Sequence, residues 1–527
     1  MKKRILAVFL VLAMLACLLC ACGGATTEVP GSSDETTASS GEAQTSGGER
    51  ASANEIIVGI PQDLDSLDPY QMGTAGTREV LFNVFEGLVK LSSDGSYVDA
   101  VAASHSVSED GLTYTFTLRD GVLFHNGETV TTDDVLHSFE ACAASTVNES
   151  VAAALSAAQI TAQGNDIVIT LTQPNSDFLA YVSNVYITPA DYADQATAPV
   201  GTGPFRFVSY SVQESFVIEK NPDYYGTPAN LDKVTFKIFD STEAELLALD
   251  AGSIDLCAHL QYDQISTLNN GYTVLDSTMN LAVALYLNNA VAPFDNEKVR
   301  QALCWAIDVD EVMAFATGGQ GVKIGSSMFP NFTKYFDPAL ADNYGYDVDK
   351  AKQLLAEAGY PDGFTFTITY ATEYEHPYGD MAAVIQQQLA KVGITVELNP
   401  IEWASWYSDV YQGRDFESTL VGFDTSVLTA SGMLQRWTTG AANNMIGYSN
   451  PDYDAAFEAA QATQDDAEQT ALYKQCLQIL SDTAANVYIQ DLAEYVVINL
   501  ALEGYQFYPL YILDMSTLRY TAGQFAR

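Results

Sequence analysis

Two kinds of periodic segment alternate along this chain, and no other feature of the sequence limits its possible folds as strongly. In one kind, apolar and polar residues alternate with a period of two, which is typical of β-strands. Such segments lie at Thr113–Leu118, Asp166–Thr172, Phe216–Lys220, Lys233–Phe239, Phe364–Tyr370 and Ile394–Leu398. The other kind has the apolar spacing of an amphipathic helix, and lies at Glu297–Ala314, Asp349–Ala358, Asp380–Val392 and Asp466–Ser481. Strands interleaved with helices predict an α/β fold with partly parallel sheets.

The length of 527 residues suits two or three domains, or one large body with two lobes. Apolar residues make up 48% of the chain and aromatic residues 11%, so the chain can bury a sizeable core. The sequence has no internal repeat, and its only clear linker lies near the N-terminus. Residues 55–527 are therefore predicted to form one body of two lobes, in which the cleft between the lobes is the default ligand site.

The charge of the chain excludes one class of partner. Lys and Arg number 23 against 67 Asp and Glu, which gives a formal net charge of −44. A protein that binds nucleic acid needs an excess of cations to neutralise phosphates, so we expect no nucleic-acid partner. Binding to anionic membrane surfaces is disfavoured for the same reason. Solubility alone explains a large net charge, so the charge does not identify a substrate.

The N-terminus has the layout of an export signal. The basic residues Lys2–Arg4 precede an apolar stretch, Ile5–Leu19, that is short for a membrane span. The residues Leu19–Cys22 that follow resemble a bacterial lipobox, which implies that residues 1–21 are a lipoprotein signal peptide and that Cys22 is lipidated. Met14–Cys17 is a second candidate lipobox, and an ordinary secretory signal is the other alternative.

Residues 22–54 are predicted to be a flexible tether. They consist almost wholly of Gly, Ser, Thr, Ala, Glu and Gln, with Val29 as the one large aliphatic residue. Such a composition buries too little apolar surface to offset the entropy of ordering. No later segment is long and apolar enough to span a bilayer. We therefore expect membrane attachment through the lipid anchor only, on the extracellular face of the bacterial cytoplasmic membrane or in the periplasm.

Four cysteines remain in the body of the chain, at Cys142, Cys257, Cys304 and Cys476. They are widely spaced, without a C-x-x-C pair or a neighbouring His. Four cysteines allow three disulfide pairings, between which the sequence does not choose. Buried free thiols are at least as good an interpretation.

Motifs for catalysis or cofactor binding are missing. The sequence contains no G-x-x-x-x-G-K-[ST], no G-x-S-x-G and no H-E-x-x-H. Its five histidines are scattered, so a metal site has little support. Paired carboxylates of a glycosidase gain no specific support in so acidic a chain. We therefore expect no catalytic residues, no metal and no cofactor, and we expect that the protein is not an enzyme.

The stretch Ser108–Phe139 is the most distinctive part of the sequence, and it reads SEDGLTYTFTLRDGVLFHNGETVTTDDVLHSF. It predicts Asp-Gly and Asn-Gly turns around a strand, and then a helix that begins near Thr131–Asp133. It resembles the signature region of family 5 extracellular solute-binding proteins, which are the oligopeptide, dipeptide and nickel receptors of ABC importers. Further resemblances follow in matching order over about 55–520, among them Leu67–Pro69, Asn83–Leu88, Gly201–Phe205, Lys220–Tyr225, Leu287–Asn289, Pro293–Asp295, Val299–Leu303, Ala358–Gly363 and Gly447–Pro451.

This resemblance implies a two-lobed periplasmic-binding-protein-like fold of type II, with a discontinuous first lobe. Lobe I would comprise 55–280 and 500–527, with an extra subdomain near 100–199, and lobe II would comprise 281–499. The resemblance also implies that a peptide or another small solute is captured between the lobes by hinge closure. The partners would be the permease and ATPase subunits of an ABC importer, and we expect the receptor to be a monomer.

Three places are predicted to line the ligand cleft, one in lobe I and two in lobe II. The family's pocket-lining loop falls at Gly73, Thr74 and Ala75, for which a plain surface loop is the alternative. In lobe II, Trp437 follows a predicted strand by a short segment and is a cleft candidate, with core packing as the alternative.

The strand that ends at Gly422-Phe423 corresponds to a Gly-Trp pair in the peptide receptors of this family. In those receptors an aspartate three residues after the Trp holds the α-ammonium of the peptide, and here that position is Ser426. A neutral hydroxyl cannot replace a charge-assisted hydrogen bond to an ammonium. Asp424 lies two residues earlier and would point to the same side if the strand continued. Asp424 is therefore a candidate to bind the cation, and a solvated carboxylate that caps a turn is the alternative.

This departure leaves the class of ligand open. Peptides are the leading hypothesis, because recognition of the peptide main chain gives broad specificity. Receptors for oligosaccharides stack sugar rings on aromatic side chains, and the missing aspartate favours this alternative. The aromatic residues Trp403, Trp406, Tyr407 and Tyr411 are expected to pack a helix face. A secreted hydrolase is a remote alternative.

Overall fold

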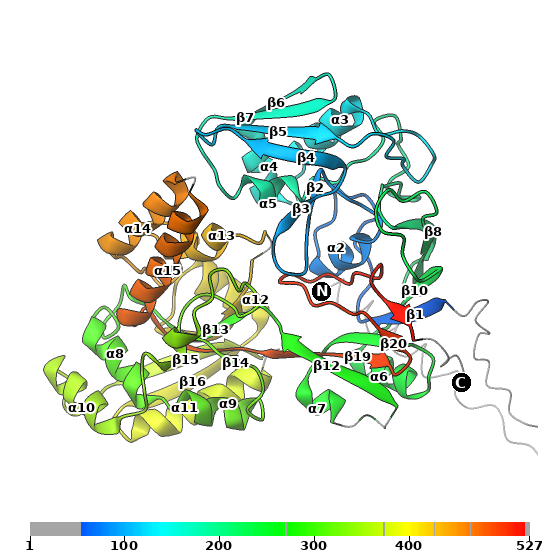
Figure 1. Ribbon diagram of the computed structural model, residues 1–527. Coiled ribbons are helices and arrows are strands. Elements are labelled where there is room, and N and C mark those ends of the chain that lie inside the picture. The colour runs from blue at the N-terminus through cyan, green and yellow to red at the C-terminus, as the bar shows by residue number, and fades with distance from the viewer. Residues whose placement is uncertain are drawn as a thin grey trace, which may run out of the picture. The chain divides into compact units, whose positions relative to one another are not determined.

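The computed structural model describes residues 54–266, 268, 271–372, 375–425, 427–463 and 465–521. The predicted signal peptide, Cys22 and all of the predicted tether except Asn54 lie outside these residues, as does Ser426. In the described part of the chain, two large sheets define two lobes, and a smaller sheet belongs to the first lobe (Figure 1).

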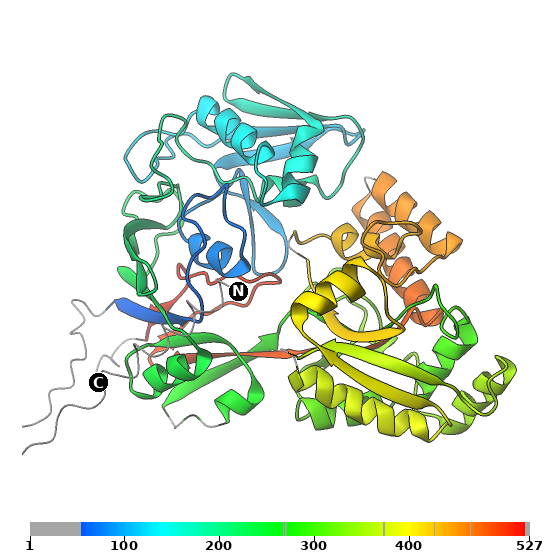
Figure 2. The ribbon, with the colours of Figure 1, turned by 180° about the vertical axis from the view of Figure 1, so that it is seen from behind.

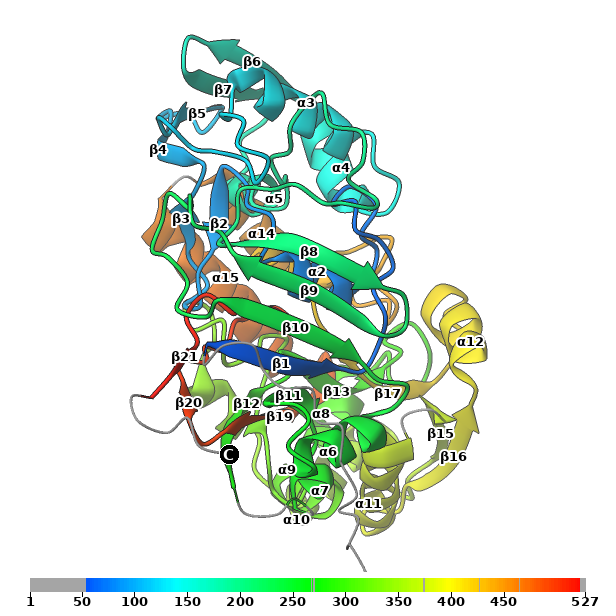
Figure 3. The same cartoon turned by 90° about the vertical axis from the view of Figure 1, so that its right-hand side faces the viewer.

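The sheet of lobe I has seven strands, and its order does not follow the chain. From edge to edge they are β12 (Tyr272–Thr278), β19 (Ala493–Asn499), β11 (Leu256–Leu260), β1 (Glu55–Ile60), β10 (Lys233–Ile238), β9 (Ser215–Lys220) and β8 (Phe205–Ser211). Strand β1 is parallel to β10 and β11, and the other neighbours are antiparallel. Figure 3 shows β8, β9, β10 and β1 side by side. The main helices of this part are α2 (Ala75–Leu81), α6 (Thr242–Asp250) and α7 (Tyr262–Ile265).

The smaller sheet falls within the range predicted for the subdomain. It is antiparallel, in the order β4 (Ala102–Val107), β5 (Thr113–Leu118), β7 (Asp166–Leu171) and β6 (Ala158–Gln163). Its core includes residues of α3 (Thr132–Ala143), α4 (Glu149–Ser156) and α5 (Phe178–Val182). The predicted start of the first helix is confirmed, because Thr131 caps α3 and forms a capping box with Asp134.

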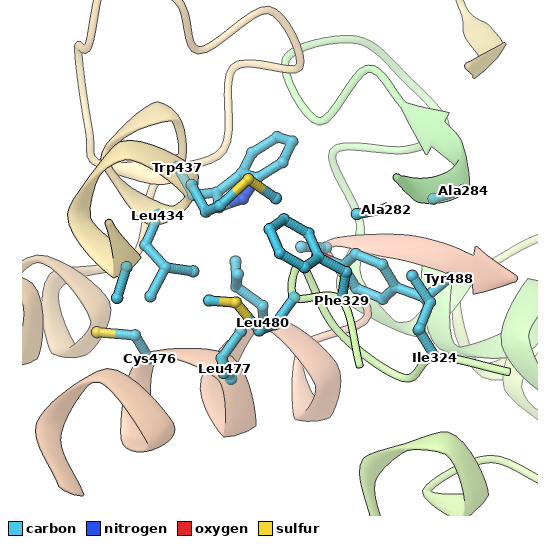
Figure 4. Close-up of a cluster of buried hydrophobic side chains, with 14 of the residues drawn as sticks. Ala282, Ala284, Ile324, Phe329, Leu434, Trp437, Cys476, Leu477, Leu480 and Tyr488 are labelled. Carbon is cyan, nitrogen blue, oxygen red and sulfur yellow. The ribbon is translucent and has the colours of Figure 1, made fainter. Parts of the chain in front are cut away.

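The sheet of lobe II has six described strands, in the order β14 (Val322–Lys323), β18 (Asn486–Asp491), β13 (Ala282–Leu287), β17 (Ser418–Phe423), β15 (Thr365–Ala371) and β16 (Thr395–Ile401). All six residues of β13 are buried, and alternate residues belong to two different cores. One core includes residues of α8 (Glu297–Ala306), α9 (Val309–Ala316), α10 (Val348–Glu357) and α11 (Asp380–Ala390). The other includes residues of α13 (Ala430–Leu434), α14 (Pro451–Ala462) and α15 (Asp466–Asp482) (Figure 4). Helices on both faces of a largely buried sheet confirm the α/β prediction.

One predicted helix is in fact two. The segment 297–314 was predicted as a single helix, but Ile307 is extended and ends α8. Asp308 then caps α9, because its side chain accepts a hydrogen bond from the Glu311 amide at 3.1 Å. Asp at an N-cap is a strong start signal. The apolar periodicity continues across this break, and for that reason the pattern alone predicted one helix.

Two short crossovers connect the lobes. Residues 279–281 join β12 to β13, and the single residue Leu492 joins β18 to β19. Figure 2 shows the red β18–β19 ribbon passing from one large sheet into the other. The predicted lobe boundary at residue 500 is therefore wrong: β19 pairs with β11 and β12 and belongs to lobe I. The run Asn486–Asn499 contains no Gly or Pro, so nothing in the sequence marks the passage between sheets.

The four body cysteines are free and buried in the structure, as thiols in four different places. Burial raises the pKa of the Cys142 thiol to about 11, so this thiol is neutral at physiological pH. The interpretation as buried free thiols is confirmed. No helix in the described ranges is long and apolar enough to cross a membrane.

Candidate functional site

The topology of lobe II directs three strand ends toward the crossovers. The chain enters β13 from lobe I, so the first residue of β13, Ala282, lies beside the crossovers. We call this side of the sheet, where strands end next to the crossovers, the crossover edge. Strand β17 is antiparallel to β13, and its last residue, Phe423, pairs with Ala282. Strands β15 and β16 are parallel to β17 and end at the same edge. Ligands of open α/β sheets bind outside the carboxyl ends of strands, so this edge is the candidate site.

Phe423 is the centre of a group of rings at this edge. Its ring lies edge-on to that of Tyr286 at 4.9 Å, and 6.1 Å from that of Tyr411. Gly422 is placed where a Cβ atom would lie 3.1 Å from the Tyr378 hydroxyl and from Val283 Cγ2. A side chain at position 422 would therefore press on these neighbours, which favours the glycine of the predicted Gly-Phe pair.

Arg436 stacks on Phe423 with its guanidinium 4.2 Å from the ring centroid. The side chain is half-buried, and its Nε is shielded from solvent without a hydrogen-bond partner in the described part of the chain. A buried donor without an acceptor is unfavourable unless something else satisfies it. The sequence interpretation missed this residue. The available signal was that Arg436 is the only arginine between Arg414 and Arg519 of a chain with net charge −44.

Asp424 is exposed at the end of β17. Together with Glu494, Glu79 and Asp491, it acts electrostatically on Tyr511 of the C-terminal segment of lobe I. Burial is the first cause that holds the pKa of Tyr511 above its ordinary value, and these four carboxyl groups add to it. The carboxylate of Asp424 therefore belongs to a concentration of acidic groups that residues of both lobes form.

One cation balances part of this acidity. Glu79 of α2 accepts from His259 Nε2 at 2.7 Å, and Glu494 of β19 is paired with His259 Nδ1. Burial disfavours the imidazolium, but the two carboxylates outweigh burial and raise the pKa of His259 well above its ordinary value. His259 is therefore charged, and its ring lies edge-on to that of Tyr511 at 4.9 Å.

The loop Gly73, Thr74 and Ala75 is exposed, and its hydrogen bonds run to its own lobe. The amides of Gly73 and Thr74 donate to Asp65 Oδ2 at 2.8 and 3.0 Å. Thr74 also caps α2. These contacts explain why the loop has its conformation, and its part in ligand binding stays a prediction.

Trp437 lies in the core of lobe II and not on a cleft wall. It is fully buried and stacks on Tyr286, with centroids 5.8 Å apart. Figure 4 shows its indole beside Leu434 and Phe329. The prediction that Trp437 is a cleft residue is therefore wrong for this structure. The short turn η5 (Gln435–Trp437) directs Trp437 inward, while its neighbour Arg436 reaches Phe423.

A series of stacked rings extends from Phe423 to the surface. Tyr411 stacks on Tyr407 at 5.5 Å, and Trp406 stacks on Trp403 at 4.9 Å. Trp406 is buried, as expected for a residue that packs a helix face, but Trp403 is 40% exposed and Tyr407 44%. The expectation that all four rings pack a helix face therefore holds for only part of the group.

A cavity lies in lobe I beside this edge. It measures about 650 Å³ including its open mouth, and the C-terminal segment that carries Tyr511 forms part of its wall through Tyr508, Leu510 and Ile512. Tyr97, another wall residue, donates to the Leu428 carbonyl of lobe II at 3.0 Å. The cavity therefore adjoins the segment that follows Asp424. Among the described residues, no group of three or more His, Cys, Asp or Glu could hold a metal ion.

Comparison with known proteins gives a consistent result. Residues 96–445 match the family model for the middle region of the bacterial extracellular solute-binding proteins, family 5. The glutathione-binding protein GsiB of Pectobacterium atrosepticum is 29% identical over 446 residues, which are 80% of this chain and 86% of the relative. The heme-binding protein A of Haemophilus influenzae is 29% identical over 465 residues, 80% of this chain and 84% of the relative.

Among solved structures, DppA of Helicobacter pylori in complex with the peptide STSA is 27% identical, with a TM-score of 0.69. The match covers 88% of this chain and 98% of DppA. The two-lobed type II fold expected from the sequence is shared with such periplasmic binding proteins.

Proposed function

The chain belongs to family 5 of the bacterial extracellular solute-binding proteins, and from this premise we propose that it captures peptides at the crossover edge of lobe II and delivers them to a membrane permease. Family 5 consists of solute-binding proteins and not of enzymes. The chain is accordingly the substrate-binding component of an ABC importer for peptides or related solutes. Its relatives are periplasmic or extracellular proteins.

The observation that carries the peptide proposal is a pair of opposite charges beside Phe423. Asp424 follows Phe423 directly, and Arg436 covers the face of the Phe423 ring without a carboxylate partner in the described ranges. A peptide has an ammonium and a carboxylate at its two ends, so both charges would find a partner. The acidic groups around Tyr511 reinforce the preference of the Asp424 side for a cation. Relatives that are named for glutathione or solved with a peptide agree with this ligand class.

The exposed rings favour a second candidate. Trp403 and Tyr407 offer two solvent-facing aromatic rings, 6.5 Å apart and tilted by 32°, shortly after the end of β16. Aromatic faces bind the apolar faces of sugar rings, so an oligosaccharide receptor is the alternative.

A binding experiment separates these ligands. Isothermal titration of the full chain with free tripeptides, N-acetylated tripeptides, tripeptide amides and cellodextrins should give binding of free tripeptides. Asp424→Asn should weaken this binding by roughly 10- to 100-fold, because a charge-assisted hydrogen bond contributes about 1.5–3 kcal/mol. N-acetylation should weaken binding to the wild type equally, and should have little further effect on the variant.

The matched control is Asp349→Asn, which removes an exposed carboxylate of the same lobe in the first turn of α10. Binding of cellodextrins with no binding of peptides would refute the peptide proposal. In that case Trp403→Ala and Tyr407→Ala should abolish sugar binding.

We also propose that the protein is a monomer attached to the outer face of the membrane through Cys22. The lipobox-like residues Leu19–Cys22 support this proposal. Cys22→Ala should release the protein into the medium, measured by immunoblotting of cell and medium fractions. If the Cys22→Ala variant stays in the membrane and Cys17→Ala frees the protein, Cys17 is the lipidated residue.

A further inference from the structure

One carboxyl group connects the two crossovers between the lobes. Asp491 is the last residue of β18, and its Oδ1 accepts from the amide of Leu281, in the other crossover, at 2.9 Å. The Met279 amide donates to the Leu492 carbonyl at 2.9 Å, which adds a backbone bond between the same two segments. Thr278, the last residue of β12, also lies within bonding reach of the Asp491 carboxyl. Any movement of one lobe against the other therefore has to strain or break these bonds.

The second oxygen of this carboxyl has no hydrogen-bond partner among the residues that the structure describes. Asp491 is fully buried, and its Oδ2 has no hydrogen bond to any described residue. An ionised oxygen in this position would be strongly unfavourable, whereas a protonated one is tolerated. The geometry therefore favours the neutral acid.

The charged groups around Asp491 do not offset its burial. Glu494 of β19 and Tyr511 of the C-terminal segment are the titratable neighbours, and neither is a cation. His259, the nearby cation, is already paired with Glu79 and Glu494. Burial raises the pKa of Asp491 to about 8, Glu494 adds to this, and the bonds from Leu281, Thr278 and Asn280 oppose it.

We propose that Asp491 is a proton-operated latch of the hinge. In its protonated form it holds the two crossovers together, and loss of the proton to solvent places an unpaired negative charge beside Glu494 and loosens the contact between residues 278–281 and 491–492. Hinge flexibility in the ligand-free protein is thus set by pH. If the proposed function is correct, the affinity for the solute should depend on pH in the same way. The latch itself requires no ligand.

Hydrogen exchange in the ligand-free full chain tests the latch. Exchange should be followed by mass spectrometry at pH 7 and pH 9 in peptides that cover 272–290 and 486–500, with rates corrected for intrinsic chemistry. In the wild type, protection of the crossover amides should fall by about tenfold at pH 9, because each unit above the pKa makes the protonated acid tenfold rarer. In Asp491→Asn, which keeps an acceptor for Leu281 but cannot ionise, protection should be equal at both pH values.

Two further variants keep the test decisive even if Asp491→Asn does not fold. Glu494→Gln removes the neighbouring charge and should move the loss of protection to a lower pH. Glu503→Gln, which breaks an exposed ion pair with Arg519, should leave the pH dependence unchanged. The latch is refuted if the wild type keeps its protection at pH 9, or if Asp491→Asn loses protection as the wild type does. Because no ligand is present, failure to bind peptides would leave this result unaffected.

Discussion

Two groups of buried acids in this protein differ in how well their oxygens are satisfied. In lobe I, Glu86 accepts from Lys90 Nζ at 2.7 Å and from the hydroxyls of Tyr224 and Tyr225 at 2.7 and 2.6 Å. In two other places, Asp491 beside the crossovers and Glu245 in α6 of lobe I, the Asp491 Oδ2 and both carboxylate oxygens of Glu245 are buried without a well-aligned hydrogen bond to the described residues. The first group is a complete network, and the second leaves buried oxygens without a donor among the described residues, which favours the protonated acid.

This difference separates two uses of a buried carboxyl. Burial disfavours the Lys90 ammonium, but Glu86 outweighs burial and holds the pKa of Lys90 above its ordinary value, so Lys90 keeps its charge. Asp491 and Glu245 instead have raised pKa values, of about 8 and about 7, and change their charge within an ordinary pH range. A satisfied network therefore fixes the fold, whereas an unsatisfied one makes the structure respond to pH.

The largest effect should come from disruption of the satisfied network. Glu86→Ala leaves a largely buried ammonium and two tyrosine hydroxyls without their acceptor, and should lower the free energy of unfolding by about 4 kcal/mol. Chemical denaturation measures this loss. Glu219→Ala, which removes an exposed ion pair with Arg206, is the control and should change stability by less than about 1 kcal/mol. Equal losses of unfolding free energy in Glu86→Ala and Glu219→Ala would contradict the prediction that the buried network stabilises the fold more than the exposed ion pair does.

The next effect concerns Glu245 and depends on pH. Burial raises the pKa of Glu245 to about 7, from an ordinary 4.5 in the unfolded chain. The folded state then binds the proton more tightly, so this group's contribution is fully present below about pH 4.5 and is lost as the pH rises to about 7. Glu245→Gln should remove a decline of about 2–3 kcal/mol between pH 4.5 and 7.5.

Unfolding measured at several pH values in the wild type and in Glu245→Gln isolates this decline. A constant difference between the two proteins over that range would mean that Glu245 is ionised throughout. The comparison of pH slopes is independent of any fixed penalty from the glutamine amide.

The smallest effect on stability should come from a steric clash with the backbone beside the crossover. Gly321 has a φ of +100°, and a Cβ there would lie 2.6 Å from the Asp491 carbonyl oxygen. Gly321→Ala should therefore destabilise the protein by about 2 kcal/mol. Gly319→Ala is a matched control, since Gly319 has a φ of +75° and nothing within 4 Å of its Cβ position. Thermal unfolding measures this effect. An equal fall in melting temperature for Gly321→Ala and Gly319→Ala would show that the contact with the Asp491 carbonyl is not the cause.

The sequence predicted those parts of the fold in which local signals agree with the tertiary structure. Strand β5 has the bounds predicted from its alternating pattern, and α3 begins at the predicted capping residues. The boundary between the lobes was misplaced because Leu492, between Asp491 and Ala493, has no Gly or Pro beside it that would mark a change of sheet. A strand that changes sheets keeps its period of two, so the pattern does not reveal the change.

The candidate site was predicted only in part, for a similar reason. Gly422, Phe423 and Asp424 lie at the edge near the crossovers, as strand order and direction require. Arg436 was missed because its significance depends on its stacking on Phe423 and on the lack of a hydrogen-bond partner for its Nε among the described residues, which are properties of the three-dimensional surroundings. The burial of Asp491 could not be predicted for the same reason, because nothing local distinguishes one aspartate among 67 acidic residues.

The position of β19 has a consequence for how the chain reaches its native state. This strand lies between β12 and β11, although more than 200 residues separate it from them in sequence. Until residues 493–499 leave the ribosome, β11 and β12 have open edges and the first half of the chain cannot complete its own sheet. Synthesis therefore yields an incomplete lobe I for most of its duration, and folding is forced toward the end of synthesis. A chain of this design is well suited to a route in which it crosses a membrane unfolded and folds afterwards.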